Sequence, residues 1–165
     1  MKIFSQKTAE KAPDRRLYGC CEGLVIDIRD SDDDIVSSGV LGDGYAVFPR
    51  YDSEKSVVGG HMVEIGSPVT GRVVDITHKP EVMIIKTEDN LKVLVNFSSF
   101  SAPQVYMTVR AGESLTAGQH IADLKVEDNN DKAFFVIVEN SDKFEKFDIL
   151  KGKTAADKPA AKYEM

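Results

Sequence analysis

Hydrophobic and polar residues alternate with a period of two in six short segments of the chain. Alternation of this kind is typical of β-strands that bury one face, and each segment is rich in valine, isoleucine or phenylalanine. Glycine, aspartate, asparagine or proline residues separate the segments, as turns require. The predicted strands are Leu24–Ile28, Tyr45–Phe48, Arg72–Ile76, Val82–Ile85, Leu91–Phe97 and Phe134–Val138. The pattern therefore predicts an all-β domain, a flattened antiparallel barrel or sandwich.

Two connections between these segments carry local signals of their own. Glu88–Asn90 separates two predicted strands and indicates a tight hairpin turn. Ser141–Leu150 instead spaces Phe144, Phe147 and Leu150 three residues apart, with a serine at the start that can cap a helix. This second segment predicts one or two helical turns.

The two ends of the chain differ in composition from its centre. Residues 1–16 and 155–165 are rich in lysine, alanine, aspartate and glutamate and show no periodicity, which is typical of flexible tails. Residues 17–154 carry all of the predicted strands. A chain of 165 residues is long enough to bury one core, so we expect a single domain between two tails.

Charge and composition exclude several classes of function. The net charge is −6 and lysine and arginine form no cluster, which argues against nucleic acid as a partner. No segment reaches the roughly 18 apolar residues of a membrane-spanning helix, and residues 1–16 lack the apolar centre of a signal peptide. We therefore expect a cytoplasmic protein that does not insert into a membrane and that needs no cofactor.

The two cysteines, Cys20 and Cys21, are adjacent in the sequence. Neighbouring cysteines rarely form a structural disulfide, so two reduced thiols packed in a strand or turn are the favoured interpretation. A vicinal redox pair is the alternative.

One segment of the chain repeats. Glu22–Arg29 (EGLVIDIR) is echoed by Thr70–Thr77 (TGRVVDIT), and in each copy a turn glycine enters a strand that ends in Asp-Ile. Repeats of this kind support a sandwich or barrel, and they also occur in lipoyl- and biotinyl-carrier domains. Those domains carry the cofactor on a lysine at a hairpin tip, whereas Lys86 precedes the predicted turn. A carrier domain is therefore the least favoured hypothesis.

Five further segments, three with glycine-containing turns and two that are strand-like, follow one another in a fixed order. They are Val40–Val47 (VLGDGYAV), Ser67–Gly71 (SPVTG), Asn90–Ser98 (NLKVLVNFS), Ala111–Gln119 (AGESLTAGQ) and Phe135–Asn140 (FVIVEN). In this order the segments resemble the glucose-type enzyme IIA family of the bacterial phosphoenolpyruvate:sugar phosphotransferase system. The resemblance runs from about Leu17 to Thr154 and implies the duplicated, hybrid-motif β-sandwich of that family.

The resemblance also assigns the family's two active-site positions. In the family, a strand written Gly-Val-Glu-Leu-(Phe/Leu)-Val-His-(Phe/Ile)-Gly ends on the histidine that carries the phosphoryl group, and Asn96 stands at that place here. The second family histidine lies fifteen residues upstream, where this chain has Glu81. The lone pair of an amide nitrogen is delocalised into the carbonyl, so Asn96 cannot act as the nucleophile. A carboxylate at the second position would repel a phosphoryl group. Phosphohistidine transfer, and with it enzyme activity, is therefore not expected at these positions.

The hairpin also predicts which residues share a face with this pair. A turn centred between Glu88 and Asp89 would place Glu81 directly opposite Asn96. Period-two alternation then divides the remaining residues of the hairpin between the two faces. Met83, Ile85 and Leu94 would join the pair on one face, and Val93, Val95 and Phe97 would lie on the other.

His78 is the candidate phosphoryl acceptor in an alternative reading of the site. It follows a predicted strand and precedes Glu81 by three residues, which brings it close to the predicted pocket. A histidine in a turn with no chemical role is the simpler interpretation. His78 and Glu81 supply two potential metal ligands, fewer than a zinc site needs, so we predict no metal site.

Two functional hypotheses follow from the resemblance. The favoured one is an enzyme IIA-like component of a sugar phosphotransferase system that acts as a binding or regulatory protein without phosphohistidine transfer. The alternative is an active phosphoryl carrier for sugar uptake that uses His78. Either hypothesis implies protein partners, namely the histidine phosphocarrier protein, the sugar-specific IIB domain or a regulated enzyme. We expect Tyr45, Phe97 and Phe100 to line the apolar docking face, although the pattern places Phe97 equally well in the core.

Overall fold

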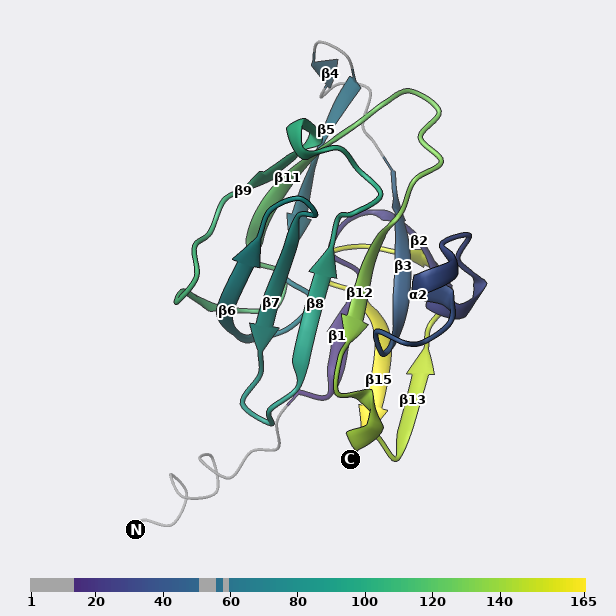
Figure 1. Cartoon of the computed structure of the whole chain (residues 1–165), viewed down its shortest axis with the longest axis vertical. Coiled ribbons are helices and arrows are strands. Elements are labelled where there is room, and N and C mark those ends of the chain that lie inside the picture. The colour runs from purple at the N-terminus through teal and green to yellow at the C-terminus, as the bar shows by residue number, and fades with distance from the viewer. Residues whose placement is uncertain (1–13, 51–55, 58–59) are drawn as a thin grey trace.

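The computed structural model of the chain describes residues 14–50, 56–57 and 60–165. These residues form three antiparallel sheets, the largest of which has eight strands (Figure 1). Its strands, in spatial order, are β10 (Ser114–Leu115), β6 (Gly71–Thr77), β7 (Val82–Lys86), β8 (Lys92–Asn96), β12 (Phe134–Val138), β3 (Asp43–Pro49), β2 (Gly23–Asp27) and β14 (Gly152–Thr154). All six predicted strands lie in this sheet, and the predicted all-β antiparallel sandwich is confirmed.

Two smaller sheets complete the sandwich, and short helical turns connect the strands. One sheet contains β1 (Arg16–Tyr18), β15 (Pro159–Glu164) and β13 (Lys146–Ile149). The other contains β4 (Ser56–Val57), β5 (Gly60–Gly66), β11 (His120–Val126) and β9 (Val105–Met107). The helical segments are α2 (Asp34–Ser37) and the 3-10 turns η1 (Ile28–Asp30), η3 (Ala102–Gln104) and η4 (Ser141–Lys143).

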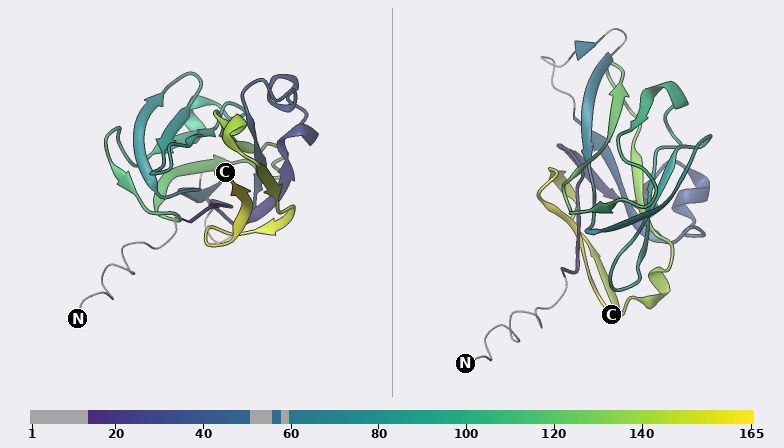
Figure 2. Two further views of the ribbon diagram at one scale, coloured as in Figure 1. Left: turned by 90° about the horizontal axis from the view of Figure 1, so that it is seen from below. Right: turned by 90° about the vertical axis from the view of Figure 1, so that its left-hand side faces the viewer.

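The main hydrophobic core lies between the large sheet and the two smaller ones (Figure 2). Val47 and Val95 of the large sheet, Ile65 of β5 and Leu17 of β1 are fully buried in one cluster. Alternate residues of the large sheet therefore point inward, as the period-two pattern requires. The other residues of these strands point to the opposite face of the sheet, away from the main core.

The repeated sequence segment has the same structural role in both copies. Gly23 begins β2 and Gly71 begins β6. A Cβ atom on Gly23 would lie 2.3 Å from the carbonyl oxygen of Phe48, and one on Gly71 would lie 2.5 Å from that of Lys86. Both glycines thus permit a close approach of the neighbouring strand, which a larger residue would prevent.

The C-terminal residues are not a flexible tail. Strand β15 covers Pro159–Glu164 and pairs with β1 on one side and β13 on the other. Ala160, Ala161 and Tyr163 of this strand are buried. Its alanine and lysine residues have low strand propensity, but pairing on both edges overrides that preference. The prediction of a tail at 155–165 is therefore wrong for β15. At the N-terminal end, β1 begins at Arg16, inside the predicted tail. Residues 1–13 of that predicted tail lie outside the described residues.

Of the helical turns predicted at Ser141–Leu150, only one is present. The 3-10 turn η4 covers Ser141–Lys143, and β13 begins at Lys146, so the predicted helical face of Phe144, Phe147 and Leu150 is wrong. The Ser141 hydroxyl does not cap the turn but accepts a hydrogen bond from the backbone N–H of Asp43 at 3.0 Å. Phe144 and Phe147 stack with their ring centroids 4.9 Å apart, so the spacing of three reflects a ring contact rather than a helical face.

Candidate functional site

Asn96 lies at the centre of a row of residues that crosses the large sheet. Its neighbours in the row are Val82 of β7 on one side and Phe135 of β12 on the other. The row continues from Phe135 through Ala46 of β3 to Ile26 of β2. Paired residues of adjacent strands project to the same face of a sheet. Asn96 therefore belongs to the face that points away from the main core.

This outer face is apolar and only partly covered. We define it by Ile26, Ala46, Phe48, Ile84, Leu94, Asn96 and Phe135. Helix α2 covers one end of it, where Val36 packs in a second buried cluster with Ala46 and Phe135 (Figure 1). Asp33 caps this helix by accepting hydrogen bonds from two backbone N–H groups at 3.0 Å each. The other end of the face is half-buried and lacks such a helix within the described residues.

The side chain of Asn96 is committed to a local hydrogen bond. Its Oδ1 atom accepts from the backbone N–H of Ser98 at 2.8 Å, and the residue is 8% exposed. An asparagine that bonds the N–H two residues ahead forms an Asx turn, which here shapes the end of β8. The amide thus has a structural role and offers no nucleophilic atom.

Glu81 does not lie opposite Asn96. The β7–β8 pairs run from Val82–Asn96 to Lys86–Lys92, so the predicted register is wrong by one residue. The hairpin loop is the cause. Thr87 and Leu91 close a three-residue loop, and Asn90 occupies a left-handed conformation with φ of 64°. A turn followed by a left-handed residue centres the loop on its middle residue and shifts the strands by one position.

The shift also changes which residues share a face. Met83 pairs with Val95 and Ile85 pairs with Val93, and all four are fully buried in the main core. The prediction that Met83 and Ile85 join Leu94 is therefore wrong, since Leu94 packs against the second cluster on the outer face.

Glu81 instead contacts His78 within the turn that joins β6 to β7. The His78 Nδ1 and Glu81 Oε2 atoms are 2.6 Å apart, and Glu81 Oε1 accepts from the backbone N–H of Lys79 at 3.4 Å. The His78 side chain is 67% exposed, whereas that of Glu81 is 7% exposed. An ionised carboxylate can only accept a hydrogen bond, so Nδ1 carries the hydrogen and Nε2 of a neutral His78 keeps its lone pair.

His78 lies near the Asn96 row but is not part of it. Thr77, the residue before His78, pairs with Val82, which in turn pairs with Asn96. Adjacent strands are about 4.8 Å apart, so the backbones of Thr77 and Asn96 are separated by roughly 10 Å. The structure thus brings His78 and Glu81 together and leaves Asn96 on a neighbouring part of the same sheet.

The three aromatic residues predicted to line a docking face lie in the core. Tyr45 and Phe97 are 0% exposed and Phe100 is 6% exposed. The Tyr45 hydroxyl donates to the Tyr18 carbonyl oxygen at 2.5 Å, and the Phe97 ring lies 5.4 Å from that of Phe134. The alternation of β3 and β8 places Tyr45 and Phe97 on the inner face of the sheet, and Phe100 is buried in the turn that follows β8. The predicted role of these side chains in docking is therefore wrong.

Burial also determines the chemistry of the two cysteines. Cys20 and Cys21 are free thiols and both are buried. Burial raises the pKa of Cys21 to about 12, and it also raises that of Cys20. Both thiols are therefore protonated at neutral pH, which is unfavourable for redox chemistry.

Two other kinds of site are absent from the part of the chain that the structure describes. Within residues 14–50, 56–57 and 60–165, no three His, Cys, Asp or Glu side chains are grouped as metal ligands. No helix in the same part of the chain is long and apolar enough to span a membrane.

The outer face itself was not identified from the sequence. Ile26, Phe48, Ile84 and Leu94 are half-buried on this face, and each alternates with a core residue. The signal was present as a second apolar residue at every other strand position, which indicates a strand with two apolar faces.

Two known proteins are similar to this chain. A 24% identical relative, the glucose-specific EIIA component of the phosphotransferase system from Halalkalibacterium halodurans, aligns over 133 residues, 78% of this chain and 70% of the relative. The solved structure of glucose permease IIA from Mycoplasma capricolum superposes with a TM-score of 0.68 and 18% identity, covering 98% of both chains. This likeness establishes the fold.

A family model gives the assignment directly. The model for the phosphoenolpyruvate-dependent sugar phosphotransferase system, EIIA 1, matches residues 15–144. The match includes β1 to β12, and with them Glu81, Asn96 and the outer face, whereas β13 to β15 follow it. The chain belongs to the EIIA 1 family of the phosphoenolpyruvate-dependent sugar phosphotransferase system.

Proposed function

We propose that this EIIA-type component binds protein partners of the phosphotransferase system without carrying a phosphoryl group on β8. The observation that carries the proposal is Asn96, which stands where the resemblance to the family places the phosphohistidine. Its Oδ1 atom holds the N–H of Ser98, and its amide nitrogen has no available lone pair. Asn96 therefore supplies a polar side chain and a hydrogen bond at this position, but no nucleophilic atom.

The outer face supplies the surface for a partner. Leu94 and Ile84 pair across β7 and β8 beside Asn96, and both are half-buried. Apolar side chains left partly open on a sheet are typical of protein-binding surfaces. By resemblance, the partners are the histidine phosphocarrier protein, the IIB domain of a sugar permease or a regulated enzyme, and binding or regulation takes place in the cytoplasm.

Titration of the isotope-labelled chain with the histidine phosphocarrier protein tests the docking surface. We expect amide shifts at Ile84, Leu94 and Phe48. The substitution Leu94→Asp should weaken binding more than tenfold, because a buried apolar anchor typically contributes over 1.4 kcal/mol. Tyr106→Asp is the matched control, since Tyr106 is 49% exposed on β9. Equal losses in both variants would show that the outer face is not the docking surface.

Incubation with phosphoenolpyruvate and the general phosphotransferase proteins tests the chemistry. We expect no acid-labile phosphoryl group on the chain under conditions that label a glucose-type EIIA component with its histidine intact. Stable docking without labelling is the predicted combination. Labelling of the unmodified chain would refute the proposal.

One contact favours a second candidate, a phosphoryl carrier that uses His78. Glu81 accepts the Nδ1 hydrogen at 2.6 Å, and His78 is exposed. In the transfer, Nε2 would form a bond to phosphorus while the P–N bond of the donor phosphohistidine breaks and its electron pair returns to the donor ring. The Nδ1 hydrogen would remain hydrogen-bonded to the carboxylate.

The two candidates give opposite results with the same assay. If His78 is the acceptor, the unmodified chain is labelled and His78→Ala abolishes the label. Glu81→Gln should then slow labelling by roughly ten- to a hundredfold, because the amide no longer stabilises charge on the ring. A label that survives His78→Ala would exclude this candidate.

A further inference from the structure

A cavity of about 410 Å³ opens at the edge of the sheet formed by β2, β3 and β14. Leu24 of β2 and Phe48 of β3 are a cross-strand pair and line it together with Pro49. Leu24 is 47% exposed, an unusual exposure for a leucine within a sheet of eight strands. The cavity thus has an apolar wall that solvent reaches.

Three cationic side chains line the same cavity. They are Arg50, Lys153 and Lys158, and the one acidic residue in the lining is Glu22. Among the described residues, none of the three cations forms an ion pair. The whole chain has a net charge of −6, so the cavity differs in sign from the rest of the protein. Because Glu22 is the one carboxylate among these three cations, the cavity has a positive local potential.

The backbones that carry these cations are fixed by hydrogen bonds. The Arg50 N–H donates to the Glu22 carbonyl oxygen at 2.8 Å, and Lys153 pairs with Leu24 across β14 and β2. The Lys158 N–H donates to the Ala155 carbonyl oxygen at 3.1 Å. Charges presented from fixed backbone positions around one cavity lose less freedom when they bind an anion than charges on a mobile loop.

We propose that this cavity binds a small organic anion that joins a phosphate-like group to an aromatic or otherwise apolar body. The anionic group would lie among Arg50, Lys153 and Lys158, and the apolar body would lie against Leu24 and Phe48. The cavity volume falls in the range of about 300–1,000 Å³ that small-molecule sites occupy. Neither Asn96 nor His78 lines the cavity, which shares Phe48 with the outer face. Anion binding at Arg50, Lys153 and Lys158 needs neither partner docking nor phosphoryl transfer, so the proposal does not depend on the proposed function.

An amide-resolved titration with three probes tests the two parts of the site. Phenyl phosphate carries both an anion and a ring, inorganic phosphate carries the anion alone, and benzyl alcohol carries the ring alone. We expect saturable shifts at Leu24, Phe48 and Lys153 with phenyl phosphate and at least threefold weaker binding of each of the other probes. Equal affinity for phenyl phosphate and inorganic phosphate would overturn the proposed ligand class, and shifts spread over other basic residues would overturn the site.

Charge-removing substitutions test the role of the cations. Exposed ion pairs contribute about 0.2–1 kcal/mol, so Lys153→Gln and Lys158→Gln should each weaken phenyl phosphate binding by about 1.5- to fivefold, and the double variant by about the product. Lys143→Gln is the control, since Lys143 is exposed in η4 and outside the cavity lining. Retained amide dispersion confirms that each variant is folded. A double variant that binds phenyl phosphate as tightly as the unmodified chain would refute the proposal.

Discussion

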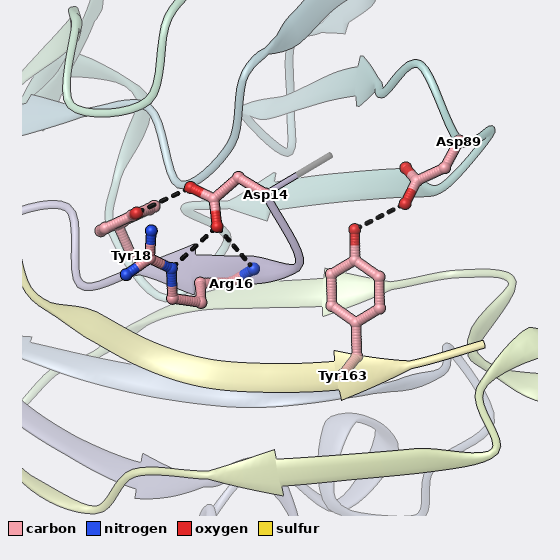
Figure 3. A network of polar contacts seen from close by, with 5 residues as sticks. All are labelled: Asp14, Arg16, Tyr18, Asp89 and Tyr163. Carbon is pink, nitrogen blue, oxygen red and sulfur yellow. Dashed lines mark hydrogen bonds and ion pairs between the residues drawn. The ribbon is translucent and has the colours of Figure 1, made fainter. Parts of the chain in front are cut away.

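Tyr163 in the C-terminal strand donates its hydroxyl hydrogen to Oδ2 of Asp89, at the tip of the β7–β8 hairpin, with the two oxygens 2.8 Å apart (Figure 3). The two residues are separated by 74 positions in the sequence. Their contact connects the three-stranded sheet with the hairpin that ends in Asn96. Asp89 also accepts a hydrogen bond from the Thr87 hydroxyl, which fixes its carboxylate within the loop.

Removal of this hydroxyl should destabilise the fold. Hydrogen bonds to charged groups contribute about 1.5–3 kcal/mol, and Asp89 is only half-buried, so we expect Tyr163→Phe to lower the free energy of unfolding by about 1–2 kcal/mol. Urea denaturation measures the change. Tyr106→Phe is the control, because Tyr106 is 49% exposed and should give a change within about 0.5 kcal/mol. Equal stability of the two variants would show that the contact is unimportant.

Stability should also fall at high pH. Burial, together with the hydrogen bond to Asp89, raises the pKa of Tyr163, and burial raises the pKa of Tyr45. A phenol whose pKa is higher in the folded state than in the unfolded state stabilises the fold fully below its unfolded pKa of about 10. That contribution is lost as the pH rises above 10. Unfolding free energies at pH 9 and pH 11 should therefore differ less for Tyr163→Phe than for the unmodified chain.

The sequence predicted six of the eight strands of the large sheet because their alternation is strong and local, and it missed the short edge strands β10 and β14. It failed for β15, where Ala160, Ala161 and Lys162 show weak strand propensity and only the pairing with β1 and β13 makes them extended. The prediction for Ser141–Leu150 failed beyond η4 for a related reason. A spacing of three between aromatic residues fits a helix as well as a turn followed by a strand, and long-range contacts decide between them.

Deletion of residues 159–165 tests the structural role of β15. Tyr163 is 5% exposed and Ala160 and Ala161 are fully buried, so the deletion opens the core on the side of β1. Loss of one large buried aromatic side chain alone costs about 3–5 kcal/mol, and we expect at least that loss. Thermal unfolding by circular dichroism measures it, with Lys162→Ala as the control at an exposed position. An unchanged melting temperature in the truncated chain would support the flexible tail after all.

The thiols should be unreactive in the folded protein. Burial raises the pKa of both Cys20 and Cys21, and the thiolate is the nucleophile in alkylation. With iodoacetamide at pH 8, we expect modification at least a hundredfold slower than in urea-denatured protein. Intact-mass measurement over time follows both rates. Rapid double alkylation of the native chain would reopen the interpretation as a redox pair.

Candidate residues could be proposed from the sequence, but their geometry could not. By resemblance, motif spacing predicts that Asn96 and Glu81 stand at the family's active-site positions, and the chemistry of an amide follows from the residue type alone. The residue that faces Asn96 could not be predicted. The left-handed conformation of Asn90 shifts the pairing of the hairpin by one position, and strand alternation carries no signal for it. The docking role expected for Tyr45 and Phe97 came from the resemblance, and the alternation of β3 and β8 instead places both side chains in the main core.

The register predicts which substitutions restore phosphoryl transfer. Val82 faces Asn96 directly, and side chains in such pairs have Cβ atoms about 4.5–5.5 Å apart, whereas Glu81 is turned toward His78. Asn96→His supplies a nucleophile, and Val82→His places a second imidazole beside it that can donate to the phosphoryl oxygens. We therefore expect Asn96→His with Val82→His to accept label from the phosphorylated histidine phosphocarrier protein at least tenfold faster than Asn96→His with Glu81→His.

Acid-labile label measured over time distinguishes the two double variants, with His78→Ala added to both so that no other candidate acceptor near the site contributes. Circular dichroism confirms that each variant is folded, which matters because Val82 is only 8% exposed. Faster labelling of the variant with Glu81→His would mean that position 81, and not position 82, faces the nucleophile in the active protein. The one-residue shift set by Asn90 would then not govern the chemistry of this face.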